Sequence, residues 1–106
     1  MKTLLAMAAL PLAVALSPTA HADAYDFIRM LDLNKVRYVS ADDAIRTGTM
    51  ACSRMRRGEP VETLNSYMLG YDYRDSNMIA VAASQTLCSD QWSKVQAAIS
   101  HGLKVR

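Results

Sequence analysis

The sequence predicts an all-α protein: a small bundle of four to five short helices that follows a cleaved signal peptide and is held by one disulfide. Three observations lead to this prediction. Apolar residues after the signal recur at helical steps of three and four. No strand-like alternation is longer than the short stretch from Lys35 to Val39. The only two cysteines are Cys52 and Cys88. A chain of 106 residues has room for one small domain.

The first 22 residues have the layout of a secretory signal peptide. After a positive start, the run from Thr3 to Leu16 is uncharged and rich in Leu and Ala, and Ala20-His21-Ala22 offers the small residues that a signal peptidase requires. An uncleaved membrane anchor is the alternative, but an apolar run of about 13 residues is too short to span a bilayer as a helix. We therefore expect residues 1–22 to be removed.

The cysteines of an exported domain this small usually form one disulfide. Two free thiols or a redox pair are the alternatives, although a redox pair normally has the spacing Cys-x-x-Cys, and Cys52 and Cys88 lie far apart. Closing so long a loop stabilises the folded state by roughly 3.5–4 kcal/mol. We expect a stapled domain over residues 23–88 and an amphipathic C-terminal helix or tail over residues 89–106.

Two helices are predicted before Gly58. The first covers residues 24–33 and ends at Asn34, a residue that tolerates the left-handed conformation. The second begins after Ser40, whose side chain is expected to cap the first free amides. Its small residues permit a neighbouring helix to approach closely, and its last turn is basic. The small residues are Ala44, Gly48 and Ala51, and the basic ones are Arg54, Arg56 and Arg57.

Two further helices and a tail follow. Glu59-Pro60 opens a third helix with Val61, Leu64 and Met68 on its buried side. Residues 71–76 are too polar for the core and predict a loop that ends in a helix cap. A fourth helix is expected over residues 77–88. The tail, which contains Trp92, Val95, Ile99 and Leu103 at helical steps, either continues that helix or forms a separate one. It either docks on the bundle or offers its apolar face to a partner.

The order of several loose motifs resembles a family of small secreted proteins that is abundant in mycobacteria, the domain of unknown function 732. The motifs are Phe27-Ile28-x-x-Leu31, Val36-x-Tyr38-x-Ser40, Ala44-Ile45-x-x-Gly48, Cys52, Arg57-Gly58-Glu59-Pro60-Val61 and Ala82-Ala83 with Cys88. The resemblance implies a secreted, helical domain with a single disulfide, and it implies no activity because the family has none assigned. Members usually end near a Tyr-Cys-Pro motif, whereas this chain has Leu87-Cys88-Ser89 and continues beyond it.

Composition and charge exclude several classes of function. Loss of Lys2 with the signal lowers the formal net charge of +2 by one. A balance so close to neutral argues against a nucleic-acid-binding protein, and against electrostatic membrane attachment as the main role.

Catalytic and metal-binding residues are scarce. His101 is the only histidine left after signal cleavage, and both cysteines are expected to be bridged, so neither a nucleophile–base pair nor a tetrahedral metal shell can be assembled from them. Asp72 with Asp75, or Asp42 with Asp43, lacks the glycine-punctuated loop of a calcium hand. We predict no catalytic residue, no cofactor and no metal.

A possible contact surface consists of six residues. Three are arginines, which either hold a phosphate or anionic head group or complement the helix dipole. Three are aromatic and either form a contact or pack in the ordinary way. The residues are Arg54, Arg56, Arg57, Tyr71, Tyr73 and Trp92.

The function predicted from these observations is that of an exported, non-enzymatic binding module of the cell envelope or extracellular space. Its partner is an unknown protein or envelope component, with no nucleic acid and no stable insertion into a membrane. The alternative is a carrier of a small apolar ligand, lipid or haem-like, in a pocket lined by Met and Tyr. The mature methionines are Met30, Met50, Met55, Met68 and Met78. A weaker third hypothesis is an enzyme whose acid–base pair is not recognisable in the sequence.

Overall fold

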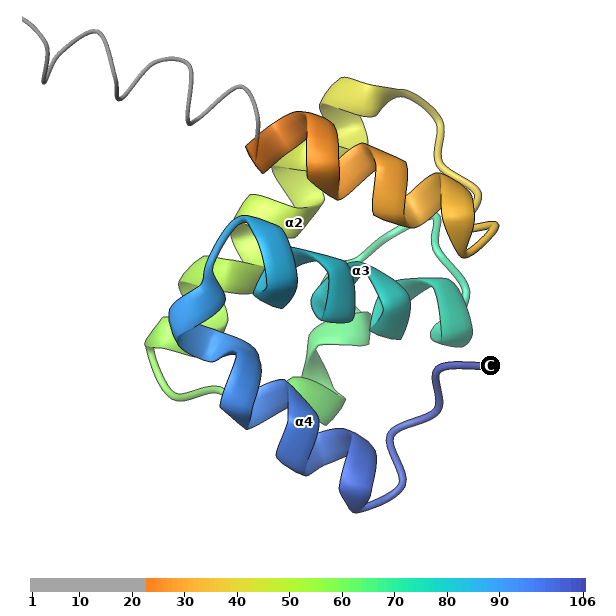
Figure 1. Cartoon of the computed structure of the whole chain (residues 1–106). Helices are drawn as coiled ribbons and strands as arrows, with labels where there is room; N and C mark the ends of the chain where they lie inside the picture. Colours follow the sequence, from red (N-terminus) through yellow and green to blue (C-terminus); the bar gives the residue numbers. More distant parts are fainter. Residues whose placement is uncertain (1–22) are drawn as a thin grey trace, which may run out of the picture.

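The computed structural model describes residues 23–106, and the predicted signal peptide lies outside the described residues (Figure 1). Throughout the described part, all regular secondary structure is helical, as predicted. An N-terminal helix over residues 23–33 is followed by α2 (Ala41–Arg56), the 3-10 helix η1 (Val61–Tyr67), α3 (Tyr73–Thr86), the 3-10 turn η2 (Ser89–Gln91) and α4 (Trp92–Ser100). None of these helices is long and apolar enough to cross a bilayer.

Helix α3 is the centre of the molecule. In Figure 1 it lies between the N-terminal helix above and α4 below, and it contacts α2, α4 and both 3-10 helices. Ten consecutive residues of α3, from Asp75 to Ser84, are buried. A helix that is covered on every side belongs to the core rather than to the surface.

The start of α3 differs from the prediction. The segment 71–76 was expected to be a loop, yet α3 begins at Tyr73, and the Asp72 side chain caps it by accepting from the Asp75 amide at 2.7 Å. Polar residues of this turn are buried because they find partners there. The Asp75 carboxylate accepts from the Arg37 amide at 3.3 Å and from the Arg74 guanidinium at 3.0 Å. Polarity therefore did not exclude this segment from the core.

The connection from the N-terminal helix to α2 contains a second correction. Asn34 was expected to take the left-handed conformation, but Lys35 does so, with φ of 56°. The Asn34 side chain instead donates to the Met30 carbonyl at 2.8 Å, and the Val36 amide donates to the Leu31 carbonyl at 3.0 Å. These bonds satisfy the last carbonyls of the helix in the manner of a Schellman motif.

Helix α2 has the predicted cap and the predicted close approach. The Ser40 hydroxyl accepts from the Asp43 amide at 3.1 Å. A Cβ atom added at Gly48 would lie 2.6 Å from Cζ of Phe27, which is fully buried, so the neighbour that requires the glycine is the N-terminal helix. At the other end of α2, the Lys94 ammonium donates to the Met55 carbonyl at 2.6 Å and thereby caps the helix from α4.

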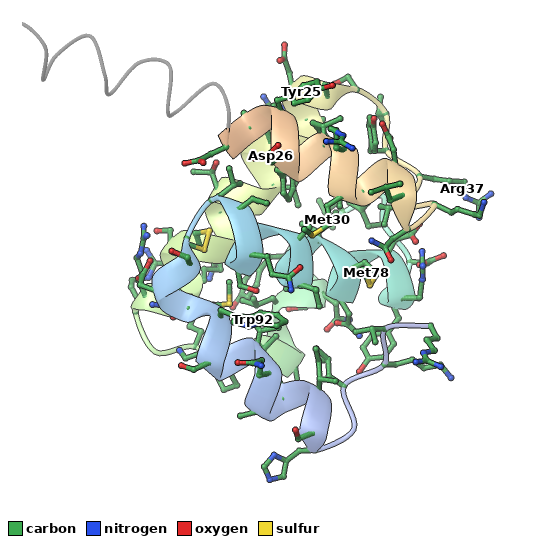
Figure 2. The ribbon with its side chains drawn as sticks, in the orientation of Figure 1. Tyr25, Asp26, Met30, Arg37, Met78 and Trp92 are labelled. Atoms are coloured by element: carbon green, nitrogen blue, oxygen red, sulfur yellow. A yellow bond between two sulfur atoms is a disulfide. The ribbon has the colours of Figure 1, made fainter. Side chains whose placement is uncertain are left out.

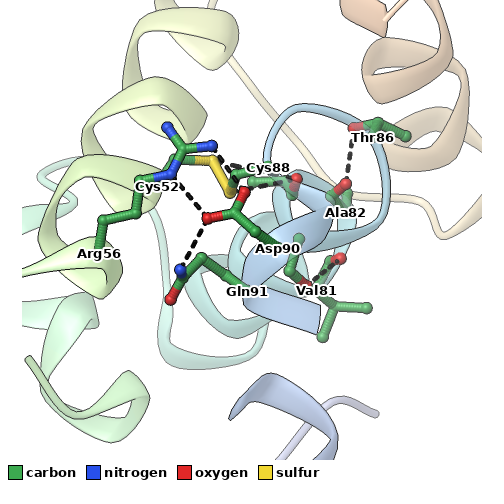
Figure 3. The surroundings of a disulfide bond; sticks show 10 residues. Cys52, Arg56, Val81, Ala82, Thr86, Cys88, Asp90 and Gln91 are labelled. Carbon is green, nitrogen blue, oxygen red and sulfur yellow. Dashed lines mark hydrogen bonds and ion pairs between the residues drawn. A yellow bond between two sulfur atoms is a disulfide. The ribbon is translucent and has the colours of Figure 1, made fainter. Parts of the chain in front are cut away.

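The predicted disulfide between Cys52 and Cys88 is present, with a Cα–Cα distance of 5.9 Å. Cys88 does not lie inside the fourth helix as expected, because α3 ends at Thr86 and Cys88 precedes η2. The bond therefore joins the C-terminal half of α2 to the turn that follows α3 (Figure 3).

The third predicted helix is a 3-10 helix rather than an α-helix. Its buried residues Val61 and Leu64 are three positions apart, which matches the period of a 3-10 helix. The tail forms a separate helix, since Leu87 to Gln91 interrupt the path from α3 to α4. Val95 and Leu103 are buried, so the tail is packed on the bundle.

Candidate binding site

Arg54, the first of the three clustered arginines, is partly buried. Its guanidinium lies over the ring of Tyr67 at 3.5 Å from the centroid. Its Nη1 donates to both carboxylate oxygens of Glu59 at 3.1 Å each. Stacking and a bidentate carboxylate fix the position of this side chain. Arg54 therefore ties the end of α2 to the segment around η1.

Arg56 and Arg57 point outward from the same turn. Arg56 donates from Nε and Nη2 to the two oxygens of Asp90, at 2.9 and 2.7 Å (Figure 3). This contact raises the pKa of Arg56 and holds the pKa of the Asp90 carboxyl well below its usual range. Arg57 is 3.5 Å from a Glu59 oxygen and its side chain remains 61% exposed. Arg57 is the most accessible of the three.

A solvent-facing hollow of about 550 Å³ lies beside these two arginines. We call it the disulfide hollow, because one of the bridged cysteines forms part of its wall. Four lining residues come from α2, one is its C-cap, one follows α3 and one begins the N-terminal helix. They are Thr49, Cys52, Ser53, Arg56 and Arg57, together with Leu87 and Asp23.

The side chains of the disulfide hollow combine two kinds of chemistry. Thr49, Ser53 and Arg56 occupy successive turns of one helix face, so two hydroxyls and a guanidinium point to the same side of α2. The Leu87 side chain and the disulfide supply an apolar wall. Hydroxyl and guanidinium donors next to an apolar wall suit an anionic group that carries a short apolar part.

The six residues of the predicted contact surface lie at two places rather than one. The three arginines lie near the end of α2, where Asp90 of η2 reaches Arg56. Tyr71 lies at the other end, where its hydroxyl donates to the Asp43 carboxylate at 2.8 Å. Along α2, Asp43 and Arg54 are separated by about 16 Å at ~1.5 Å per residue.

The aromatic members also differ in exposure. Tyr73, the first residue of α3, is 47% exposed. Tyr71 is half-buried, and Trp92 is half-buried against the core, between α3 and α4 in Figure 2. Trp92 is thus a packing residue of the core, while Tyr71 and Tyr73 lie at the start of α3, away from the three arginines.

The five mature methionines lie in the core or at its edge. Met55, Met68 and Met78 are buried in the core, and Met30 and Met50 pack against it. Among three of the best-formed hollows of residues 23–106, one of about 320 Å³ includes Met30 in its lining.

The sequence of this chain matches a known protein family. The profile of the family described as "Protein of unknown function (DUF732)" matches residues 22–90. The chain belongs to this family. The resemblance drawn from the motifs is confirmed, and the matched range includes both cysteines and every lining residue of the disulfide hollow. Neither the curated proteins nor the solved structures contain a match. Membership of DUF732 assigns no activity.

The described residues of this DUF732 member contain no group of three or more His, Cys, Asp or Glu side chains that could hold a metal ion. His101 is exposed, and its Nδ1 lies 2.8 Å from the Ala97 carbonyl at the end of α4. Within residues 23–106, His101 forms no hydrogen bond with another titratable side chain. Its observed contact is with the helix end.

Sequence reasoning missed four residues of the disulfide hollow. Thr49 and Ser53 precede Arg56 and Arg57 at helical spacing, so a search for polar stripes on the second helix would have found them. Leu87 and Asp23 come from distant parts of the chain and leave no signal in the local pattern. Only the packing of the N-terminal helix against α2, through Phe27 and Gly48, brings Asp23 to this place.

Proposed function

We propose that this protein is an exported, non-enzymatic binding module of the cell envelope or extracellular space, and that it binds a phosphate-like anionic group in the disulfide hollow. The observation that carries the proposal is the convergence of Arg56, Arg57, Thr49 and Ser53 beside the disulfide. The export of the chain rests on its signal-like first 22 residues and on the presence of a disulfide.

The frame around the hollow supports a binding role because its donors are held in place before a ligand arrives. Asp90 fixes the Arg56 guanidinium through two hydrogen bonds, and the disulfide fixes α2 against the segment that follows α3. A side chain already held in one orientation loses less entropy on binding. The volume of about 550 Å³ suits a small molecule or the head group of a larger one.

The test is a titration of isotopically labelled mature protein, followed by amide chemical shifts. Inorganic phosphate and dodecyl phosphate are the two probes, since they present the same anion without and with an apolar chain. We expect shifts at Thr49, Ser53 and Arg57, and a stronger response to dodecyl phosphate if Leu87 contacts the chain. Binding of inorganic phosphate with equal affinity would point to a free anion, and stronger binding of dodecyl phosphate to an amphiphile.

The variant Arg57→Gln should weaken binding of either probe about 3- to 10-fold, because it removes an accessible charge. The matched control is Arg46→Gln, which removes an arginine with a side chain 72% exposed near the other end of the same helix. Equal affinities for Arg57→Gln and the unchanged protein would refute the site. An absence of any shift at millimolar probe would refute the proposed function.

A further inference from the structure

We propose that the disulfide hollow is completed only when the signal peptide is removed, because the new α-amino group of Asp23 supplies its decisive positive charge. This inference rests on the proposed function. Hydrolysis of the bond between Ala22 and Asp23 consumes one water, leaves a carboxylate on Ala22 and frees an amine on Asp23. At neutral pH an α-amino group, whose pKa is about 8, is mostly protonated.

The position of Asp23 is the first support. Asp23 lines the disulfide hollow, is half-buried and is the first described residue of the N-terminal helix. Its backbone nitrogen is one bond from its Cα, so an amine formed there lies at the edge of the same hollow. Two other ionic residues line different hollows. Asp26 lines the hollow that includes Met30, and Lys94 lines a third hollow between η1 and α4.

The charge balance is the second support. Before cleavage, the three arginines Arg54, Arg56 and Arg57 are matched by three carboxylates. Glu59 contacts Arg54 and Arg57, Asp90 contacts Arg56, and Asp23 lines the wall. A neutral cluster gives an anion little net attraction. One additional ammonium group gives the cluster a net charge of +1, so processing creates the net positive charge that an arriving anion meets.

The free helix end is the third support. After cleavage no residue precedes Asp23, so the first amides of the N-terminal helix have no acceptor within the helix. These amides and the positive end of the helix dipole favour a nearby anion. They act at the wall where Asp23 meets α2, and therefore add to the donors that Ser53 and Thr49 already supply.

The consequence is a binding site that is weak in the precursor and gains affinity in the exported form. Intracellular phosphate compounds would not occupy the precursor strongly during synthesis, whereas the mature protein would meet its ligand outside the cytoplasm. Signal cleavage thereby acts on the binding site as well as on the location of the protein.

The experiment compares three forms of the mature chain that begins at Asp23, with inorganic phosphate and dodecyl phosphate as probes. The first form is unmodified. The second is carbamylated selectively at the α-amine at neutral pH, where that amine is far less protonated than lysine, and a single addition is verified by intact mass. The third carries Asp23→Asn, which removes the opposing carboxylate but keeps the amine.

We expect carbamylation to weaken binding of either probe about 3- to 10-fold, and Asp23→Asn to strengthen it by a similar factor. Carbamylated Arg46→Gln protein is the matched control and should lose as much affinity as the carbamylated parent. Equal binding before and after carbamylation, with Arg57→Gln still weakening it, would overturn this inference and leave the proposed function standing. No binding by any form would overturn both.

Discussion

Single polar residues hold distant parts of this chain together at the residue scale. The Asn77 side chain donates to the Lys104 carbonyl at 2.7 Å and so anchors the C-terminal segment to α3. Arg74 donates to the Asn34 carbonyl at 2.6 Å and ties the first turn of α3 to the connection before α2. A buried polar group stabilises a fold only when it finds such a partner, and each of these residues has one.

The pKa of Tyr71 gives a testable prediction at this scale. Burial and, next, the hydrogen bond to Asp43 raise the pKa of the phenol from 10.0 to about 12. Because the folded-state pKa is raised, the contribution of Tyr71 to stability is complete below pH 10 and is lost as the pH rises through about 12. We expect Tyr71→Phe to lower the free energy of unfolding by about 1 kcal/mol at neutral pH.

Chemical denaturation at neutral pH and near-ultraviolet absorbance during alkaline titration measure these two effects. In the alkaline titration, Tyr71→Phe should lack the absorbance change of a tyrosine that ionises well above pH 10. The control is Tyr73→Phe, since the Tyr73 side chain is 47% exposed and should leave the free energy of unfolding unchanged. A loss of late-ionising absorbance in Tyr73→Phe but not in Tyr71→Phe would contradict the assignment.

At the scale of the elements, the fold depends on how closely α2 and the N-terminal helix approach α3. Gly48 lies where Phe27 and Leu87 converge, and it leaves no room for a larger side chain. Phe27 is completely buried, so its ring has little freedom to move away. The glycine is required here by packing rather than by backbone conformation, since its φ is not among the positive values of the chain.

Gly48→Ala is expected to lower the free energy of unfolding by about 1–3 kcal/mol through overpacking, although alanine favours a helix by roughly 1 kcal/mol over glycine. The added Cβ would lie 2.6 Å from Cζ of Phe27. Denaturant titration measures the effect. Phe27→Leu combined with Gly48→Ala should recover part of the loss, because the two sites are in contact.

Ser53→Ala, an exposed change on the same helix, should alter the free energy of unfolding by no more than about 0.5 kcal/mol and serves as the control. A Gly48→Ala protein that is more stable than its parent would show that helix propensity outweighs the contact with Phe27.

The elements also show what the sequence can and cannot predict. The Ser40 cap, the close approach at Gly48 and the number of helices follow from local patterns, and the structure contains them. The early start of α3 follows from a local signal that the prediction overlooked, since Asp72 and Asp75 stand three positions apart at the start of a helix.

Other features depend on partners that no local pattern identifies. Asp75 is buried because the Arg37 amide reaches it, and Asn77 is buried because the Lys104 carbonyl does. The disulfide hollow also depends on residues that lie far apart in the sequence. Its arginines and hydroxyls could be placed on one helix from spacing, but its Leu87 and Asp23 walls required the packing of three separate segments.

The whole molecule has two ends of different character. At one end, the disulfide and a set of ion pairs join α2 to the segments around η1 and η2. At the other end, hydrogen bonds from the Arg74 guanidinium and to the Asp75 carboxylate join the first turn of α3 to the chain before α2, and Arg74 and Asp75 form an ion pair at 3.0 Å. Ion pairs occur at both ends, and the disulfide is the tie that distinguishes the end beside the proposed binding site.

Replacing both cysteines by alanine tests the disulfide at this scale. We expect the free energy of unfolding to fall by roughly 3.5–4 kcal/mol, because the unfolded chain gains the freedom of a long open loop. A small domain has on the order of 5 kcal/mol in total, so much of the population should unfold on mild warming. Circular dichroism during thermal and denaturant unfolding measures the change.

Reductant should destabilise the parent by a comparable amount and leave the cysteine-free variant unaffected. If the variant unfolds at nearly the same denaturant concentration as the parent, the packing of α3 rather than the crosslink would be the main source of stability.

The capping of α2 by Lys94 has a consequence for the minimal length of this protein. The family profile stops at residue 90, yet Val95 and Leu103 fill the core and Lys94 closes the last turn of α2. A fragment that ends at residue 90 would expose apolar core side chains and the unpaired carbonyl oxygens at the end of α2 to water. A shortened form of this chain that is to remain folded should therefore retain its final segment.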